Sequence, residues 1–442
     1  MRVKKLSVLM VIILAFSLFL SACSSSKDNA STSASDNSSN GKSSSDSSSK
    51  DVTIVWARGK DTTNATKDML AAFEKKYPHI HVKVLEEPND TGKQHDAYVT
   101  AFNAKSSAID VINMDVVWPA EFAQAGYTLP LDRFIQQDHV DLSQYSQGAL
   151  SAAQFNGKQW ALPLFVDAGV LFYRTDLVKT PPKTWDDLIA DAKQLQGKNG
   201  TKYGMLLQAD QYEGLVCNAV EYLGSYGGAF INKDGKVSVD TPQAIKGLTE
   251  LKKIAVDSGI TPSNITNFQE TDTDNSFIQG QSVFARNWPY MWADANDKTK
   301  SKIVGKVGVA ALPSGDAGTA SALGGWQMGI NKYSKHPQEA WKLVEFMTGL
   351  EGEKIQSISG GSAPAITSLY SDPDVLKANP FFKQKGFQEA VANATSRPVA
   401  PNYQQISSII QIHVSKMLAG QETPAQAAAN MQKEMEAAMK QS

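Results

Sequence analysis

Two groups of side chains in this sequence could recognise a polar, ring-shaped ligand. The first is an aromatic cluster at 288–292, Trp-Pro-Tyr-Met-Trp, together with Trp326 in a Leu-Gly-Gly-Trp turn. The second is a pair of acids near the ends of predicted strands, Asp115 and Asp167, with Arg397 further along the chain. Sugars present hydroxyls, which bond strongly to charged groups, and C–H faces, which pack on aromatic rings. The combination indicates a carbohydrate-binding cleft.

Three other interpretations stay open on the residues alone. The aromatic side chains could belong to the hydrophobic core, although polar residues follow the 288–292 cluster. A secreted glycoside hydrolase could use Asp115, Asp167 or Glu213 as its acid and base. A surface adhesin or a peptide receptor would bind polymers or peptides instead, because a fold alone does not determine a function.

Other site chemistries find little support in the sequence. His79 and His81 share one face of a predicted strand, but no cysteine or carboxylate cluster joins them. We therefore expect them at the surface rather than in a metal site. The sequence has no P-loop, no Gly-x-Gly-x-x-Gly after a strand and no Gly-x-Ser-x-Gly. Neither a metal nor an organic cofactor is expected.

The first fifty residues have the composition of an exported segment. Basic residues precede an apolar run at 6–20, and the run ends in Leu-Ser-Ala-Cys at Cys23. This pattern predicts a secretory signal peptide at 1–22, since the apolar run is short for a membrane span. The Leu-Ser-Ala-Cys tetrapeptide resembles a bacterial lipobox, in which the thiol of Cys23 is acylated. The serine-rich segment at 23–50 then forms a flexible tether.

The composition of the remainder describes a soluble globular protein. Apolar residues make up 42% of the chain and charged residues 20%, which is ordinary for that class. Residues 51–442 are too many for one core, so two domains are expected. A net charge of -2 gives no reason to expect nucleic acid as a partner. With Cys23 acylated no intramolecular disulfide can form, and Cys217 is expected to be a buried apolar residue.

Strands and helices alternate along the chain. Hydrophobic patterns predict strands at 53–56, 80–84, 109–113, 171–174 and 306–312, and helices at 62–77, 92–105, after an N-cap at Thr184, at 338–349, at 403–418 and after Pro424. Such alternation indicates βαβ units and mainly parallel sheets. Ligands of these sheets gather beyond the carboxyl ends of the strands, where Asp115 is expected.

Several segments carry a resemblance to a known family. They are 110–118 (DVINMDVVW), 157–163 (GKQWALP), 171–177 (LFYRTDL), 182–185 (PKTW), 286–290 (RNWPY) and 323–326 (LGGW). With the lipoprotein-like start, these segments resemble the extracellular solute-binding proteins of ABC importers, in the maltose-type family 1 group. Residues 211–217 (QYEGLVC) and the Arg397-Pro398 turn look most like the trehalose/maltose-binding branch of that group.

The resemblance implies an α/β, two-lobed periplasmic-binding-protein-like fold of type II, each lobe a mainly parallel sheet flanked by helices. Lobe 1 would comprise 51–166 plus 313–357, and lobe 2 would comprise 167–312 plus 358–442, with hinge crossovers between them. The protein would be a monomer without enzymatic activity, anchored through lipid on the extracellular face of the bacterial cell membrane. It would capture a disaccharide such as trehalose or maltose and deliver it to an ABC permease.

The resemblance also implies which residues face the sugar. They are Asp115, Gly325 and Trp326 from lobe 1, and Asp167, Trp288, Tyr290 and Arg397 from the hinge and lobe 2. The two aspartates would accept hydrogen bonds from hydroxyls, the arginine would donate them, and the aromatic rings would stack on sugar faces.

Three places depart from the branch pattern. Phe165 stands where the branch has a tyrosine, an acidic contact is missing near Asn64–Ala65, and an arginine is replaced around Gln94–His95. These departures bear on which sugar is bound rather than on the class of ligand.

Overall fold

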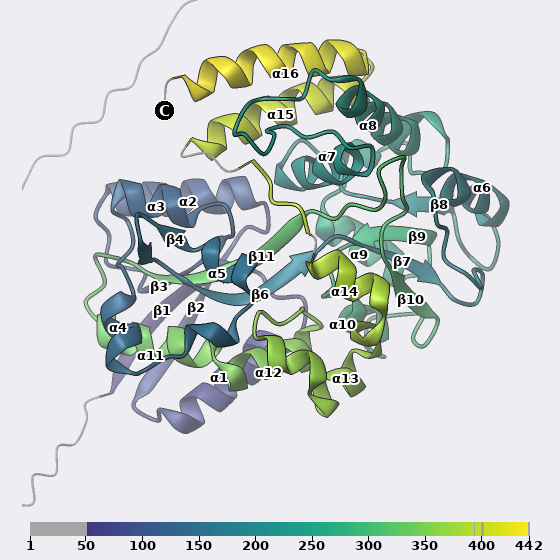
Figure 1. The fold of residues 1–442 in the computed structure, drawn as a ribbon. Helices are drawn as coiled ribbons and strands as arrows, with labels where there is room; N and C mark the ends of the chain where they lie inside the picture. The colour runs from purple at the N-terminus through teal and green to yellow at the C-terminus, as the bar shows by residue number, and fades with distance from the viewer. Residues whose placement is uncertain (1–50, 393, 399–401, 441–442) are drawn as a thin grey trace, which may run out of the picture. The chain divides into compact units, whose positions relative to one another are not determined.

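The computed structural model describes residues 51–392, 394–398 and 402–440 (Figure 1). The predicted signal peptide, the acylation site Cys23 and the whole of the predicted tether lie outside the described residues. Within the described part of the chain, every helix is either too short or too polar to cross a membrane.

The first of two large sheets has five strands in the order β2-β1-β3-β11-β6. Its strands are β1 (Val52–Gly59), β2 (Ile80–Glu87), β3 (Val111–Asp115), β6 (Leu162–Ala168) and β11 (Leu323–Ile330). Strand β1 pairs in parallel with β2 and β3, whereas β11 runs antiparallel to both β3 and β6. The carboxyl ends of β1, β2 and β3 therefore meet at one edge of this sheet.

The second sheet has four strands in the order β10-β7-β9-β8. They are β7 (Val170–Arg174), β8 (Tyr203–Leu206), β9 (Ser282–Asn287) and β10 (Val307–Ala310). Strands β8 and β9 are parallel, but β7 is antiparallel to both of its neighbours. The α/β class is confirmed, while the expectation of mainly parallel sheets is wrong because both sheets are mixed. The antiparallel strands β6, β7, β10 and β11 are those by which the chain passes from one sheet to the other.

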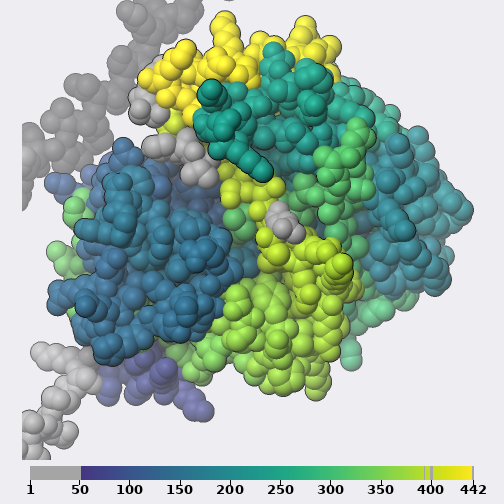
Figure 2. All heavy atoms as spheres, in the orientation of Figure 1, coloured from purple at the N-terminus to yellow at the C-terminus, as the bar shows by residue number. Residues whose placement is uncertain are grey.

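Helices cover both sheets (Figure 1). The longer ones are α1 (Ala65–Lys76), α2 (Thr91–Asn103), α6 (Trp185–Leu195), α7 (Glu213–Ser225), α8 (Pro242–Lys252), α9 (Glu270–Ile278), α11 (Pro337–Thr348), α12 (Leu350–Gly360), α15 (Tyr403–Leu418) and α16 (Pro424–Met439). The shorter ones are α3 (Pro119–Ala125), α4 (Asp132–Gln137), α5 (Gln147–Ser151), α10 (Met291–Asn296), α13 (Pro373–Ala378) and α14 (Lys385–Ala392); β4 (Gln154–Phe155) and β5 (Lys158–Gln159) form a small hairpin. Helix α15 contacts α7 and α16 contacts α8, so the yellow helices of Figure 2 lie over the teal ones.

Local sequence signals account for several helix ends. The predicted N-cap Thr184 is confirmed, because its hydroxyl accepts a hydrogen bond from the Asp187 amide at 3.1 Å while the Asp187 carboxylate accepts one from the Thr184 amide. The helix expected from Thr62 instead begins at Ala65. The reason is a turn before it, in which the Asp61 carboxylate accepts the amides of Thr63 and Thr66, each at 2.8 Å.

The crossing from β6 to β7 depends on Gly169. A Cβ atom at this position would lie 1.9 Å from Oε1 of Glu221 and 2.6 Å from Nη2 of Arg286. Those two side chains form an ion pair in which each is 1% exposed. Only glycine lets the backbone pass this close to the buried pair. Cys217, on α7, is buried as expected.

Candidate functional site: a cavity lined from both sheets

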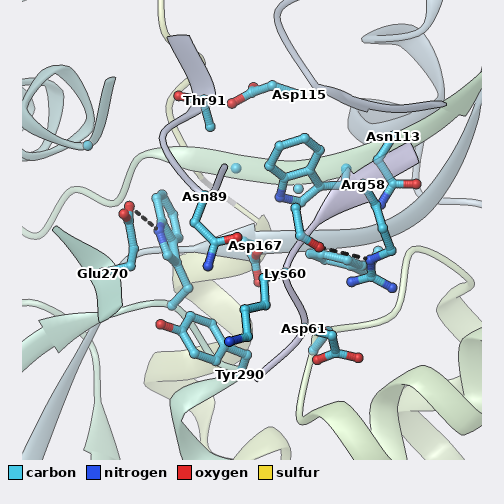
Figure 3. Close-up of a pocket in the computed structure, with 18 of the residues that line it drawn as sticks. Arg58, Lys60, Asp61, Asn89, Thr91, Asn113, Asp115, Asp167, Glu270 and Tyr290 are labelled. Atoms are coloured by element: carbon cyan, nitrogen blue, oxygen red, sulfur yellow. Dashed lines mark hydrogen bonds between the residues drawn. The ribbon is translucent and has the colours of Figure 1, made fainter. Parts of the chain in front are cut away.

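A cavity of about 180 Å³ lies between elements of the two sheets. All seven residues predicted to face a ligand line it: Asp115, Asp167, Trp288, Tyr290, Gly325, Trp326 and Arg397. They come from the end of β3, from β6 and β11, from the segment after β9, and from the segment before α15. Figure 3 shows part of this wall, with Asp167 near the centre of the view and Tyr290 at its lower left.

The aromatic part of the wall is held by charged groups. The Nε1 atom of Trp288 donates to Oε1 of Glu270 at 3.2 Å, and the Arg286 guanidinium lies 4.0 Å from the centre of the Trp288 ring. Oε2 of Glu270 also accepts from the Tyr212 hydroxyl at 2.6 Å. The hydrogen bond to Glu270 and the contact with Arg286 hold the Trp288 ring in one orientation. Trp288 therefore presents a fixed, half-buried surface to the cavity.

Trp326 forms the opposite aromatic wall. Its ring packs edge-on against Trp118, with 5.8 Å between centroids. The preceding Gly325 has φ +123°, and a Cβ atom there would lie 2.5 Å from the carbonyl oxygen of Phe165. Glycine is therefore required for β11 to pass β6 at this place and to turn Trp326 toward the cavity.

The terminal nitrogens of Arg397 are paired with two acids. It forms a bidentate pair with Asp115, in which Nη1 lies 3.0 Å from Oδ2, and the same Nη1 donates to Oε1 of Glu213 at 2.8 Å. Glu213 also accepts from Ser407 at 2.5 Å and from the hydroxyl of Tyr403. All three charged side chains are buried. This network joins the end of β3, in the first sheet, to α7 and α15 beside the second.

Asp167 has no such partner. It is buried, and its Oδ1 atom makes no hydrogen bond within the described part of the protein. Burial raises the pKa of the Asp167 carboxyl well above its usual range, Arg286 opposes this rise and the charge of Asp115 adds to it. A ligand hydroxyl donating to Oδ1 would satisfy the atom and favour the ionised form.

Sequence reasoning missed one wall of the cavity. Arg58, Gly59, Asn89, Thr91 and Gln94 line it from the ends of β1 and β2 and from the start of α2. The rule that placed Asp115 beyond a strand end applies equally to β1 and β2, and it could have found these residues. Figure 3 shows Arg58, Asn89 and Thr91 around the cavity.

The loop after β1 also contributes an acid. Neither Asn64 nor Ala65 lines the cavity, but Asp61 in the same loop does. Burial of Asp61 is outweighed by Arg58 and by the hydrogen bonds from Thr63 and Thr66, which together lower its pKa to about 2. The loop in which an acidic contact is missing near Asn64–Ala65 thus still places one acid, Asp61, at the cavity.

His79 and His81 are both exposed, which confirms their expected surface position. Among the residues that the structure describes, no three His, Cys, Asp or Glu side chains are grouped to hold a metal ion.

Comparison with known proteins decides the family. The family model described as "Bacterial extracellular solute-binding protein" matches residues 59–354. This chain belongs to that family. One relative of this solute-binding protein is a "Probable ABC transporter-binding protein" of Deinococcus radiodurans, 36% identical over 357 residues, which cover 78% of this chain and 83% of the relative.

Solved structures agree on the fold. The solute-binding protein is similar to maltose-bound MalE3 of T. maritima, with a TM-score of 0.82, 36% identity and coverage of 87% of this chain and 99% of the other. It is also similar to the GacH receptor of Streptomyces glaucescens, solved unliganded and with acarbose, with a TM-score of 0.77, 26% identity and coverage of 88% and 98%. The fold of the solute-binding protein is therefore the two-lobed periplasmic-binding type. The relatives are named as binding proteins rather than as enzymes.

Proposed function

We propose that this solute-binding protein captures a disaccharide of the trehalose/maltose class in the cavity between its lobes and delivers it to an ABC importer. One observation carries the proposal. Half-buried Trp288, Tyr290 and Trp326 line the same cavity as Asp167, whose Oδ1 atom has no partner in the described protein. Ring faces beside an unpartnered acceptor suit a sugar. The maltose-bound and acarbose-bound neighbours support the same class of ligand.

In this proposal the ligand holds the lobes together. A sugar that contacts Asp115 and Trp326 from the first sheet, and Trp288 and Tyr290 from the second, binds the closed form better than the open one. Gly325 would contribute only backbone atoms to the cavity wall beside Trp326. Arg397 would donate to the sugar only through N–H groups that its pairs with Asp115 and Glu213 leave free. One such group is Nε, which has no hydrogen-bond partner in the described protein.

The glycoside hydrolase alternative is disfavoured by the same network. A hydrolase needs one carboxylic acid and one carboxylate free to act on the glycosidic bond. Asp115 and Glu213 are both ion-paired with Arg397. Of the three acids Asp115, Asp167 and Glu213, only Asp167 is therefore outside an ion pair, and a hydrolase needs two.

The proposed lobes keep the boundaries 51–166 plus 313–357 and 167–312 plus 358–442. The observed contacts bear on the last segment, because α13 contacts α12, and α14 contacts both β6 and β10. We propose that α13 and α14 are the part of lobe 2 that lies against the first lobe, before the chain continues into α15 and α16.

The membrane anchor is also a proposal. Acylation of Cys23 after removal of residues 1–22 would hold the protein, as a monomer, on the extracellular face of the membrane. The variant Cys23→Ala should be released into the medium, while the wild type stays in the membrane fraction and incorporates labelled palmitate. Equal membrane association of the two proteins would contradict the anchor.

A panel of sugars tests the function. We expect maltose or trehalose to raise the melting temperature of the purified protein and to bind in titration calorimetry, because a ligand of the native state stabilises it. Prolonged incubation should release no glucose from either sugar. Absence of binding by both disaccharides, or release of glucose, would refute the proposal.

A further inference from the structure

Gln94, on α2, reaches the cavity with a fully buried side chain. It is 0% exposed, and its Oε1 atom has no hydrogen-bond partner within the described part of the protein. An unpaired buried acceptor is unfavourable unless something else satisfies it. In the sequence, an arginine of the related branch is replaced around Gln94–His95, and no ligand contact is predicted for Gln94 itself.

The orientation of the Gln94 amide follows from its neighbour Tyr98. The Tyr98 hydroxyl lies 3.0 Å from the carbonyl oxygen of Ala57, which can only accept, so the single hydroxyl proton points there. The Tyr98 oxygen must then accept from Gln94, whose Nε2 lies 2.8 Å away. The amide nitrogen is thereby turned toward Tyr98, and the oxygen is left as an acceptor for the cavity.

The space beside this oxygen is narrow and polar. A Cβ atom on Gly59 would lie 3.6 Å from Oε1 of Gln94 and 3.0 Å from Oδ1 of Asn89, so the Gly59 backbone lies close to both amide oxygens. Thr91 lies three residues before Gln94 and on the same helix face. Its Oγ1 atom is buried and also without a partner in the described structure. Gln94 can only accept a hydrogen bond there, whereas Thr91 can donate one.

A neutral hydroxyl matches this pair better than a cation does. A hydroxyl can donate to Gln94 and accept from Thr91 at the same time. An ammonium group can only donate, and it would lie in a wall that already carries the buried Arg58 guanidinium.

We propose that Gln94, assisted by Thr91, is a specificity-determining residue that requires one particular hydroxyl of the bound sugar. The inference rests on the proposed function and deepens it. An analogue that lacks this hydroxyl leaves Oε1 of Gln94 buried and unpaired, and its affinity falls at least tenfold. Sugars that keep the hydroxyl but differ elsewhere on the same ring are less affected.

The experiment measures the affinities of maltose, trehalose and their monodeoxy analogues by titration calorimetry. In the wild type, one analogue should bind at least tenfold more weakly than its parent. Gln94→Met should bind the parent sugar with at least tenfold lower affinity than the wild type does. Its affinities for the parent sugar and for that same analogue should lie within about twofold of each other. The matched control is Gln327→Met, which removes another fully buried glutamine with an unpartnered Oε1, away from the cavity. It should keep the wild-type preference.

Two failures can be told apart. If the wild type binds neither disaccharide, the proposed function is wrong. If it binds but Gln94→Met still discriminates against the same analogue, only the role of Gln94 is overturned. Should Gln94→Met fail to fold, Thr91→Val leaves the bonds between Gln94, Tyr98 and Ala57 intact. Thr91→Val must lower the affinity for the parent sugar more than the affinity for the sensitive analogue. Equal losses of affinity for the two ligands would overturn the inference.

Discussion

A buried pair of carboxyl groups, Asp274 on α9 and Asp294 on α10, predicts how stability depends on pH. Asp274 is 3% exposed and Asp294 is 1% exposed. Asp294 accepts from Nζ of Lys300 at 2.6 Å and from the hydroxyl of Thr62 at 2.8 Å. Asp274 instead faces Asp294 and lies near Tyr290. Burial, together with the charge and hydrogen bonding of Asp294, raises the pKa of Asp274 to about 8.

The direction of the effect follows from proton linkage. An unfolded aspartate has a pKa of about 3.9, so between about pH 4 and the pKa of about 8 the folded protein holds a proton that the unfolded chain does not. The free energy of unfolding therefore falls as pH rises across this window, and this contribution is fully present only below about pH 4. Since each pH unit is worth about 1.4 kcal/mol at most, the total is on the order of several kcal/mol.

The variant Asp274→Asn should abolish this dependence. Its amide has the shape of the protonated acid and can donate to Asp294, but it takes up no proton. Relative to the wild type, its free energy of unfolding should rise by on the order of 3–4 kcal/mol between pH 5 and pH 8. Urea unfolding at half-unit pH steps measures both proteins.

A second variant controls for the change of residue type. Asp297→Asn alters an acid 3.9 Å from Lys300 that lies outside the buried pair. It should follow the wild-type dependence between pH 5 and pH 8. If the stability of Asp274→Asn falls with rising pH as steeply as that of the wild type, the proton that stabilises the folded protein is not held by Asp274.

Three further variants test the site itself. Thr62→Val removes the hydrogen bond to Asp294, which links the loop after β1 to α10; we expect about fivefold weaker maltose binding because the closed form loses about 1 kcal/mol, and unchanged calorimetric affinity would contradict this. Trp288→Ala removes a stacking face and should weaken binding at least tenfold with native circular dichroism, so a smaller loss would argue against stacking. Asp115→Ala leaves Arg397 with a single acid; it should weaken binding at least tenfold and lower the melting temperature by several degrees, and an unchanged melting temperature would refute the buried pair.

Local patterns in the sequence predicted most of the secondary structure. The helix expected at 403–418 has the observed bounds of α15, and the capping box at Thr184 is present. Such features depend on neighbours three or four residues away, so sequence spacing contains them. Strand directions were predicted less well, since mainly parallel sheets were expected and both sheets are mixed. The direction of a strand depends on how the chain enters its sheet after crossing from the other sheet.

The ligand-facing residues divide in the same way. Strand-end logic, aromatic composition and family resemblance together selected seven positions that all line one cavity. What each can bind was not visible, because it depends on contacts between distant segments. Arg397 meets Asp115 across 282 positions of sequence, and Thr62 meets Asp294 across 232.

By itself, the amino-acid sequence determined the α/β class, several helix ends and the chemical kinds of side chain available for a ligand, since these follow from short-range periodicity and composition. Only the tertiary structure decided which of those side chains remain unpaired. The terminal nitrogens of Arg397 are paired with Asp115 and Glu213, whereas Asp167 and Gln94 each keep a buried acceptor free. Whether a polar atom is left for a ligand depends on every neighbour that packing brings to it, and packing joins residues that are far apart in the chain.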